Sequence, residues 1–426
     1  MKTKNFFLNK YASLLLCSLM LLFSCSKKDD PSKEPDLDER LQLVIKASST
    51  ETMEGQEITF EITADGEVID AEIYVDNDKI SGASHTFEEA GAYTAFAKKE
   101  GYIDSEKNTI IVKEQEYQTD VYISGNDNIG SKTVAKYWKN GTPIALSDGS
   151  QSAVAHSIVV NSGDVYVVGS DNDGSGGLAV YWKNGTRVTM TTSSKYPMSY
   201  GRSIAVDNGN VYVSGEQKSI GHSAATYWKD GTPVKLADDG RANSIVVVNE
   251  EVHVVGEGYD HPDYLAKYWK NGTLVKLTNG SQNSIATSVT ADNEDVYVAG
   301  FEYIDHGYSA TRSITKYWKN GTPVELGEHA IPVGIVIDNG DVYVAAKDYS
   351  NNKNKAKYWK NDTSVALTDG HFIAGANAIT VNDGDVYVAG YENSKAVYWK
   401  NGEAVILESN GNAEATSIFL VKRPVE

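Results

Sequence analysis

The sequence predicts an all-β fold in which one four-stranded unit recurs seven times, and three recurring phrases support this prediction. Every tryptophan lies in a Tyr-Trp-Lys triplet, and the gaps between successive triplets are 44, 46, 41, 49, 41 and 40 residues. A second phrase, typified by "DVYVAG", and a looser third phrase, typified by "SIVV", keep the same step. Such a period indicates a propeller or another repeat array. The tryptophans are Trp138, Trp182, Trp228, Trp269, Trp318, Trp359 and Trp399.

Each copy reads as four antiparallel strands joined by tight turns. The "SIVV" and "DVYVAG" phrases are rich in β-branched and aromatic residues, as strands are. Short polar turns such as "NSGD" and "DNGD" separate them, and Asn-Gly follows most of the Tyr-Trp-Lys triplets. Asn-Gly between two β runs is a strong hairpin signal, because both central residues of the turn need positive φ. Radially arranged four-stranded sheets of this length form a β-propeller.

The two ends of the array predict how it closes. The array opens at Asp120 with a second-type strand that has no first strand before it. The chain ends in "TSIFLVK", a first-type strand without the other three. We therefore expect the last strand to complete the first sheet, so that residues 117–426 form a closed seven-bladed propeller. Closure removes the free edges that would otherwise pair with another chain.

Two repeated features have structural interpretations. Neighbouring side chains on a strand point to opposite faces, so the Tyr and Trp of each triplet are expected to pack between adjacent sheets. An acidic residue opens the second strand in six copies, and Asn210 stands there in the remaining one. A Lys ends every third strand, so a cross-strand ion pair such as Asp164 with Lys183 is expected.

The first 25 residues combine a basic segment, an apolar stretch and a cysteine. Three lysines precede the apolar residues 11–23, a stretch that is short for a membrane span, and "LFSC" ends at Cys25. This pattern resembles a bacterial lipoprotein signal. The resemblance implies that residues 1–24 are a signal peptide, that Cys25 is lipidated, and that residues 25–37 are a flexible tether on the outer membrane.

The tether begins with "SKKDD", directly after the cysteine. A Lys followed by acidic residues at this place resembles the surface-export signal of Bacteroidetes-type lipoproteins, and it implies exposure at the cell surface. A plain solvated linker is the alternative interpretation.

Residues 38–115 differ from the repeats in composition and contain no Trp. About seven short runs of alternating apolar and polar residues, separated by turn signals, predict a small β-sandwich. The run "EAGAYTAFAKKEGY" resembles the late hairpin of PKD-like or bacterial Ig-like domains. That resemblance implies a spacer or adhesive module.

Charge and cysteine content exclude several functions. The chain has 58 acidic and 39 basic residues and a formal net charge of −19, which disfavours nucleic acid and anionic membranes as partners. We expect contact with a membrane only through the lipid anchor. The other cysteine, Cys17, would leave with the signal peptide, so cysteine-based catalysis and cysteine metal sites are excluded. We expect no cofactor and no metal.

The variable loops provide the first group of candidate binding residues. The turns at one end of the predicted propeller are short and repeated, whereas the loops at the other end vary in length and sequence. Loops on a rigid scaffold carry function, and tyrosines beside polar residues suit sugar rings and protein surfaces alike. The alternative is that these rings pack only on their own blades. The candidates are Tyr259, Tyr264, Tyr303, Tyr308, Tyr349 and Tyr391.

A second group of candidates is positional. The residue that enters each first strand is expected at the mouth of the central channel, and it is polar in six of the seven copies, with Val333 as the exception. Simple solvation of a wet channel is the alternative interpretation. The six polar residues are His156, Arg202, Asn243, Thr287, Asn377 and Thr416.

Other signals are weaker. Asp171 and Asp173 lie in "DNDGSGG", but the spacing departs from a calcium loop. The blade size and the single Gly of "DVYVAG" resemble kelch repeats, which implies a shared architecture only, because the kelch double Gly is missing. No spacing identifies catalytic residues. We therefore expect a surface lipoprotein that binds a glycan or a protein, and the alternative is a polysaccharide lyase or glycoside hydrolase.

Overall fold

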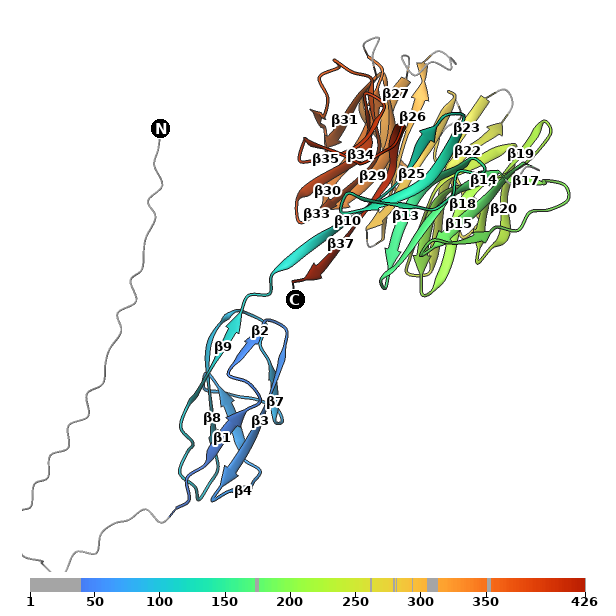
Figure 1. Ribbon diagram of the computed structural model, residues 1–426. Helices are drawn as coiled ribbons and strands as arrows, with labels where there is room; N and C mark the ends of the chain where they lie inside the picture. The colour runs from blue at the N-terminus through green and yellow to red at the C-terminus, as the bar shows by residue number, and fades with distance from the viewer. Residues whose placement is uncertain are drawn as a thin grey trace, which may run out of the picture. The chain divides into compact units, whose positions relative to one another are not determined.

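The computed structural model describes residues 40–425, except residues 173–175, 261–262, 279, 281, 293, 305–312 and 351–353. Cys25, Tyr308 and Asp173 lie outside the described residues. The chain divides into two compact units, Met1–Gln115 and Glu116–Glu426. The described residues of both units form strands (Figure 1). Within the described ranges no helix has the length and apolarity needed to cross a membrane.

Residues 40–115 of the first unit form two sheets around one hydrophobic core. Strand β3 alternates exposed and buried residues, and its Phe60 packs with Phe87, Ala95 and Ile110 in that core. The four-stranded sheet contains β1 (Val44–Ala47), β3 (Glu57–Ala64), β4 (Glu67–Val68) and β7 (Ser84–Thr86). The five-stranded sheet runs β2 (Glu51–Met53), β9 (Asn108–Lys113), β8 (Gly91–Lys98), β5 (Glu72–Val75) and β6 (Asp78–Lys79).

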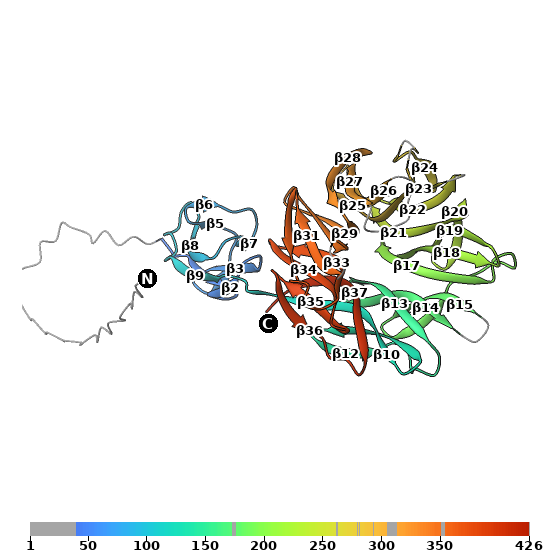
Figure 2. The same cartoon turned by 90° about the horizontal axis from the view of Figure 1, so that it is seen from above.

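The described part of the second unit holds seven antiparallel four-stranded sheets, and the predicted order of four strand types holds in each. The first strands surround the middle of the unit (Figure 2). The all-β propeller fold that the repeats predict is therefore confirmed. The first strands are β13 (Ala153–Asn161), β17 (Met198–Asp207), β21 (Gly240–Val248), β25 (Ser284–Asp292), β29 (Ala330–Asp338), β33 (Ala374–Asn382) and β37 (Asn412–Pro424).

The second strands are the "DVYVAG" phrases, and each pairs with a first and a third strand. They are β10 (Tyr117–Ile129), β14 (Asp164–Asn172), β18 (Asn210–Ser219), β22 (Glu251–Asp260), β26 (Asp295–Tyr303), β30 (Asp341–Asp348) and β34 (Asp385–Glu392).

The third strands end in the Tyr-Trp-Lys triplets. They are β11 (Lys132–Lys139), β15 (Gly177–Lys183), β19 (His222–Lys229), β23 (Asp263–Lys270), β27 (Ser313–Lys319), β31 (Lys355–Lys360) and β35 (Lys395–Lys400). The fourth strands form the outer edges of the sheets. They are β12 (Thr142–Ala145), β16 (Thr186–Thr189), β20 (Thr232–Asp238), β24 (Thr273–Val275), β28 (Thr322–Glu328), β32 (Thr363–Ala366) and β36 (Glu403–Ile406).

The last strand of the chain lies in the same sheet as the first strand of the repeat array. β37 pairs antiparallel with β10 from Asn412, opposite Asn128, to Pro424, opposite Tyr117. Trp138 of this sheet packs against Ala389 of β34, in the sheet that precedes β37 in the chain, and against Leu407, which directly follows β36 of that sheet. Backbone pairing and side-chain packing thus join the two ends of the array.

The tryptophans pack between sheets, as their position in the triplet predicts. All seven are at most 2% exposed. In each of seven hydrophobic clusters, the Trp of one sheet contacts residues of the preceding sheet; Trp182, for example, packs with Tyr122 and Ala135. The indole of Trp138 also donates a hydrogen bond to the carbonyl of Glu408 (2.8 Å). Burial between sheets, and not ligand stacking, accounts for the repeated Trp.

The turns and ion pairs at the short-turn end also match the prediction. Asn140 and Gly141 both have positive φ (50° and 83°), as a type I′ turn requires. The amide of Asn140 donates to the carboxylate of Asp120 and accepts from the N–H of Val121. The Lys ending the third strand pairs with the acid opening the second in all six copies that have both.

Candidate functional site

A β-bulge marks the same place in all seven first strands. The register against the second strand shifts by one residue at this place, so one residue of the first strand has no partner opposite it. Bulges of this kind redirect a side chain and are frequent beside active sites. The bulged residues are His156, Arg202, Asn243, Thr287, Val333, Asn377 and Thr416, the seven positions expected at the channel mouth.

The bulge explains the glycine of the "DVYVAG" phrase. At Gly169 an added Cβ would lie 1.8 Å from the carbonyl oxygen of Val154 on the bulged strand, and at Gly256 it would lie 1.9 Å from that of Arg241. A Cβ at either glycine could be accommodated only if the two backbones moved apart. In the sixth sheet Ala346 stands at this position, opposite Pro332. The kelch-like glycine therefore reflects backbone geometry in this chain.

The bulged residues line one pocket of about 540 Å³. All seven first strands contribute to it, at the end where the first strands begin and the variable loops meet. Its volume is in the range of small-molecule sites. The structure thus brings all seven predicted channel-mouth positions together, and Tyr303 lies with them. The complete lining is His156, Arg202, Arg241, Asn243, Glu257, Ile285, Thr287, Phe301, Tyr303, Ile331, Pro332, Val333, Lys347, Asn377, Glu414 and Thr416.

The other predicted tyrosines that the structure describes do not line the pocket. Tyr259 and Tyr264 flank the loop between β22 and β23, where their rings are 5.0 Å apart and 40% and 39% exposed. Tyr349 and Tyr391 are half-buried, and Lys347 packs over the ring of Tyr391. Burial raises the pKa of both of these phenols. None of these four residues lines the pocket. Tyr349 nevertheless interacts electrostatically with Tyr391 and with the pocket residue Tyr303.

Several pocket residues were missed by the sequence interpretation. Arg241 and Glu414 lie two residues before a bulged position, and Glu257, Phe301 and Lys347 follow the glycine, or its alanine replacement, on a second strand. A signal for them does exist in the sequence. The residue after the "DVYVAG" phrase varies among six residue types in the seven copies: Asn126, Ser170, Glu216, Glu257, Phe301, Lys347 and Tyr391.

The two halves of the pocket differ in polarity. β25, β26 and β29 supply a largely apolar wall that includes Ile285, Phe301 and Pro332. β17, β21 and β22 supply a charged wall that includes Arg202 and Arg241. Such a lining suits a ligand with one apolar and one polar side.

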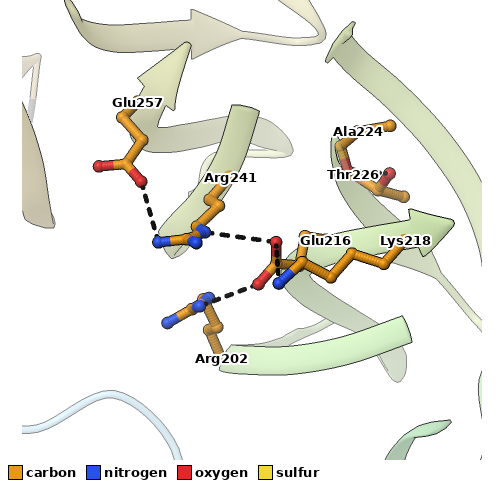
Figure 3. Close-up of polar contacts among 7 residues, drawn as sticks. All are labelled: Arg202, Glu216, Lys218, Ala224, Thr226, Arg241 and Glu257. Atoms are coloured by element: carbon orange, nitrogen blue, oxygen red, sulfur yellow. Dashed lines mark hydrogen bonds and ion pairs between the residues drawn. The ribbon is translucent and has the colours of Figure 1, made fainter. Parts of the chain in front are cut away.

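The charged wall is an ion-pair cluster centred on Glu216 (Figure 3). The side chain of Glu216 is only 2% exposed; Arg202 Nη2 lies 3.0 Å from its Oε1, and Arg241 Nε lies 3.3 Å from its Oε2. Lys218 Nζ is 3.5 Å from the same carboxylate. Arg241 Nη1 reaches Glu257 Oε1 at 3.3 Å. One buried carboxylate therefore holds guanidinium groups from two neighbouring first strands.

One buried donor in this cluster has no partner among the described residues. The Nε atom of Arg202 is buried and makes no hydrogen bond within the described part of the chain. Leaving a buried donor unpaired costs about 1–3 kcal/mol, so such atoms are rare in the absence of a water or a ligand. This atom is a candidate contact for a ligand.

Three ionisable groups that line the pocket have shifted pKa values. Burial, together with the charge of Arg202, lowers the pKa of His156 to about 4, so its imidazole is neutral at pH 7. Burial raises the pKa of Glu257, although Arg241 opposes this shift. Burial also lowers the pKa of Lys347. All three shifts have desolvation as their main cause, as expected for charged groups in a concave site.

No metal centre is visible in the described residues, where no cluster of three or more His, Cys, Asp or Glu side chains could hold an ion. At the weak calcium pattern, the carboxylate of Asp171 is bound to the guanidinium of Arg187.

Comparisons with known proteins do not identify a family. No family model matches the chain, and no curated protein matches it in sequence. Solved structures with a similar fold include the β-propeller domain of the Trilobed protease from Pyrococcus furiosus, at 13% identity and a TM-score of 0.40 over 61% of this chain and 84% of that chain.

Two further similar structures are apo AztD from Citrobacter koseri and an exo-1,5-α-L-arabinanase from a bovine ruminal metagenomic library. AztD is 12% identical, with a TM-score of 0.36 over 83% of this chain and 98% of that chain. The arabinanase is 10% identical, with a TM-score of 0.30 over 52% of this chain and 99% of that chain. The topology of the second unit itself makes it a β-propeller.

Proposed function

We propose that the chain is a surface-anchored glycan-binding protein whose propeller pocket holds the end of a sugar chain. The observation that supports this most is the convergence of seven bulged residues on one pocket of about 540 Å³. A concave site of this size admits one or two sugar rings and is too narrow for a flat protein surface.

The polarity of the pocket also favours a sugar. A pyranose ring presents C–H groups on one face and hydroxyl groups around its edge. The apolar wall with Ile285, Phe301 and Pro332 suits the C–H face. Hydroxyl groups would meet the side chains of Asn243, Thr287 and the charged wall. The amide of Asn243 already donates to the carbonyl of Ala286 (3.0 Å), which fixes its orientation before a ligand arrives.

A glycan array with the full chain in detergent, followed by titration of the best ligands, tests this function. Tyr303→Ala should weaken binding about tenfold, since one lost aromatic contact costs on the order of 1–2 kcal/mol. Tyr259→Ala should have a smaller effect, because Tyr259 lies outside the pocket.

Lys229→Ala and Lys319→Ala are the matched controls, because both lysines lie at the opposite, short-turn end of their sheets. Loss of binding in these lysine variants, with full binding in Tyr303→Ala, would reject the pocket as the site. Capture of a protein with no glycan bound would reject the glycan assignment.

A glycan-cleaving enzyme is the second candidate, and Glu257 is the observation in its favour. The side chain of this residue is 9% exposed, it lines the pocket, and burial raises its pKa, as general acids require. Glu414 supplies a second carboxyl group in the same lining. Incubating the wild-type chain with its array ligands and measuring new reducing ends decides the matter. Cleavage that Glu257→Gln abolishes would establish an enzyme.

We also propose that the chain is held on the outer membrane through a lipid on Cys25. The support is the resemblance of residues 1–25 to a lipoprotein signal. Labelling cells with a fatty-acid analogue should mark the wild-type chain and leave Cys25→Ala unmarked. Equal labelling of Cys25→Ala would show that the lipid is attached elsewhere.

A further inference from the structure

We propose that the pocket selects an acidic sugar, whose carboxylate binds to the guanidinium groups of Arg202 and Arg241. This inference rests on the proposed glycan function and specifies its ligand class. It derives from the geometry and charge of the Glu216 cluster.

The two guanidinium groups are held in place before a ligand binds. Glu216 contacts both from behind, with Arg202 Nη2 at 3.0 Å and Arg241 Nε at 3.3 Å. The side chain of Glu216 is 2% exposed, so the carboxylate that holds the two guanidinium groups is buried and not in solvent. Arg202 and Arg241 lie on β17 and β21, two neighbouring first strands (Figure 3). Preorganised charges bind an anion at a smaller entropic cost.

Donors remain for a ligand. Arg202 Nε is buried without a partner, and within the described residues neither Arg202 Nη1 nor Arg241 Nη2 makes a hydrogen bond. The side chains of Arg202 and Arg241 are 35% and 45% exposed, so a ligand can reach them. A network that served stability alone would be expected to satisfy its buried donors. The planar fork of a guanidinium matches the two oxygens of a carboxylate.

The local charge favours an anion. The cluster contains three cations, Arg202, Arg241 and Lys218, and two carboxylates, Glu216 and Glu257, so it is one positive charge in excess. The whole chain has a formal net charge of −19. Lys347 adds a cation to the lining, opposed by Glu414. This cationic wall in a strongly acidic protein would attract the carboxylate of a sugar acid and hold neutral sugars less tightly.

Two matched pairs of probes test the inference by titration calorimetry on the full chain in detergent: 3′-sialyllactose against its methyl ester, and tetragalacturonate against its methyl ester. Each pair keeps the sugar frame and differs in the free carboxylate. We expect the acidic member of at least one pair to bind about tenfold or more tightly, the scale of a charge-assisted hydrogen bond. Raising the salt concentration should reduce this preference.

Substitutions assign the preference to the two arginines. Arg202→Gln and Arg241→Gln should each reduce the preference to about threefold or less, and Arg202→Lys should restore only part of it, because lysine lacks the planar fork. Arg187→Gln is the matched control, since Arg187 is bound to Asp171 and lies outside this pocket. It should leave the preference unchanged.

The outcomes separate this inference from the proposed function. Equal or weaker binding of both acidic probes, with a neutral sugar bound, would overturn the inference and leave the glycan function standing. An undiminished preference in both glutamine variants would place the acid elsewhere and overturn the assignment to the arginines. If a variant fails to fold by its melting curve, the comparison of probes on the wild-type chain still decides. If no glycan binds, the proposed function fails, and the inference with it.

Discussion

The two ends of the propeller have the same backbone repeat and use it differently. At the short-turn end both backbone and side chains repeat: Lys183 pairs with Asp164 as Lys319 pairs with Asp295, at 2.8 and 2.7 Å. At the pocket end the bulge repeats in all seven sheets, but the bulged residue is His, Arg, Asn, Thr or Val. Repeated side chains thus mark contacts that the fold needs, and a repeated backbone position with changing side chains marks a place free to specialise.

The third sheet shows that a blade can form without the ion pair between its second and third strands. Asn210 replaces the acid there, and Lys229 keeps only the packing over the ring of Tyr212 that the corresponding Lys and Tyr of the ion-paired sheets also make. The sheet still forms all four strands in register. Changes that remove a strand or fill the bulge should therefore destabilise the propeller far more than changes to single charges.

The largest effect is expected from removing residues 414–426. This deletion takes away most of β37, including the buried Ala415 and Ile418, and leaves β10 without its inner neighbour. We expect Tm to fall by roughly 10 °C or more, since each kcal/mol lost shifts Tm by about 2–4 °C in large domains. Removing only residues 425–426 is the control. A truncated chain that melts like the wild type would show that this pairing does not support the fold.

The second effect concerns the bulge itself. In Gly169→Ala the new Cβ would lie 1.8 Å from the carbonyl oxygen of Val154, so the backbone must move. We expect a loss of about 2 kcal/mol or more in the free energy of unfolding, measured by chemical denaturation. Gly163→Ala is the matched control: its φ is 84°, but no atom lies within 4 Å of the new Cβ, so only strain is added. If both variants lose the same stability, the close approach is not what requires Gly169.

A smaller effect should appear as a pH dependence. His156 has a pKa of about 4 in the folded chain and 6.5 when unfolded, so the unfolded state gains a proton first as pH falls. Stability should therefore drop between about pH 6.5 and pH 4, by on the order of 1–3 kcal/mol. His156→Gln should remove this part of the drop, as seen in denaturation midpoints at several pH values. The raised pKa of Glu257 acts in the opposite direction in both chains and cancels from the difference. Identical pH profiles for the two chains would contradict the lowered pKa of His156.

The smallest effect is expected at the short-turn end. Lys319→Ala removes one exposed ion pair with Asp295, and exposed pairs contribute little because water and salt screen them. We expect Tm to change by no more than about 2 °C. A larger loss, in the absence of a similar loss in Lys229→Ala, would show that this pair matters to the fold.

Much of the fold could be predicted from the sequence because the repeat acts through local rules. Alternation and β-branched residues define the strands, Asn-Gly defines the hairpins, and seven Tyr-Trp-Lys triplets predict packing between sheets. The channel-mouth position of each first strand could also be predicted, because it stands at the same place in every copy of the repeat. All seven of these positions, of which His156 is the first and Thr416 the last, line the pocket.

Only the tertiary structure decided which of the variable residues meet. Arg202 and Arg241 are 39 positions apart in the chain, and they share Glu216 because two first strands lie side by side in the propeller. Tyr259 and Tyr303 stand at the same place in the repeat, three residues after the glycine of the second strand, yet only Tyr303 lines the pocket. The bulge was also not predicted from the sequence, because it depends on how the backbones of two strands meet and not on the type of the bulged residue. Sequence determined the repeating sheet, where each contact is local or repeated; the structure determined the pocket, where single residues from different sheets converge.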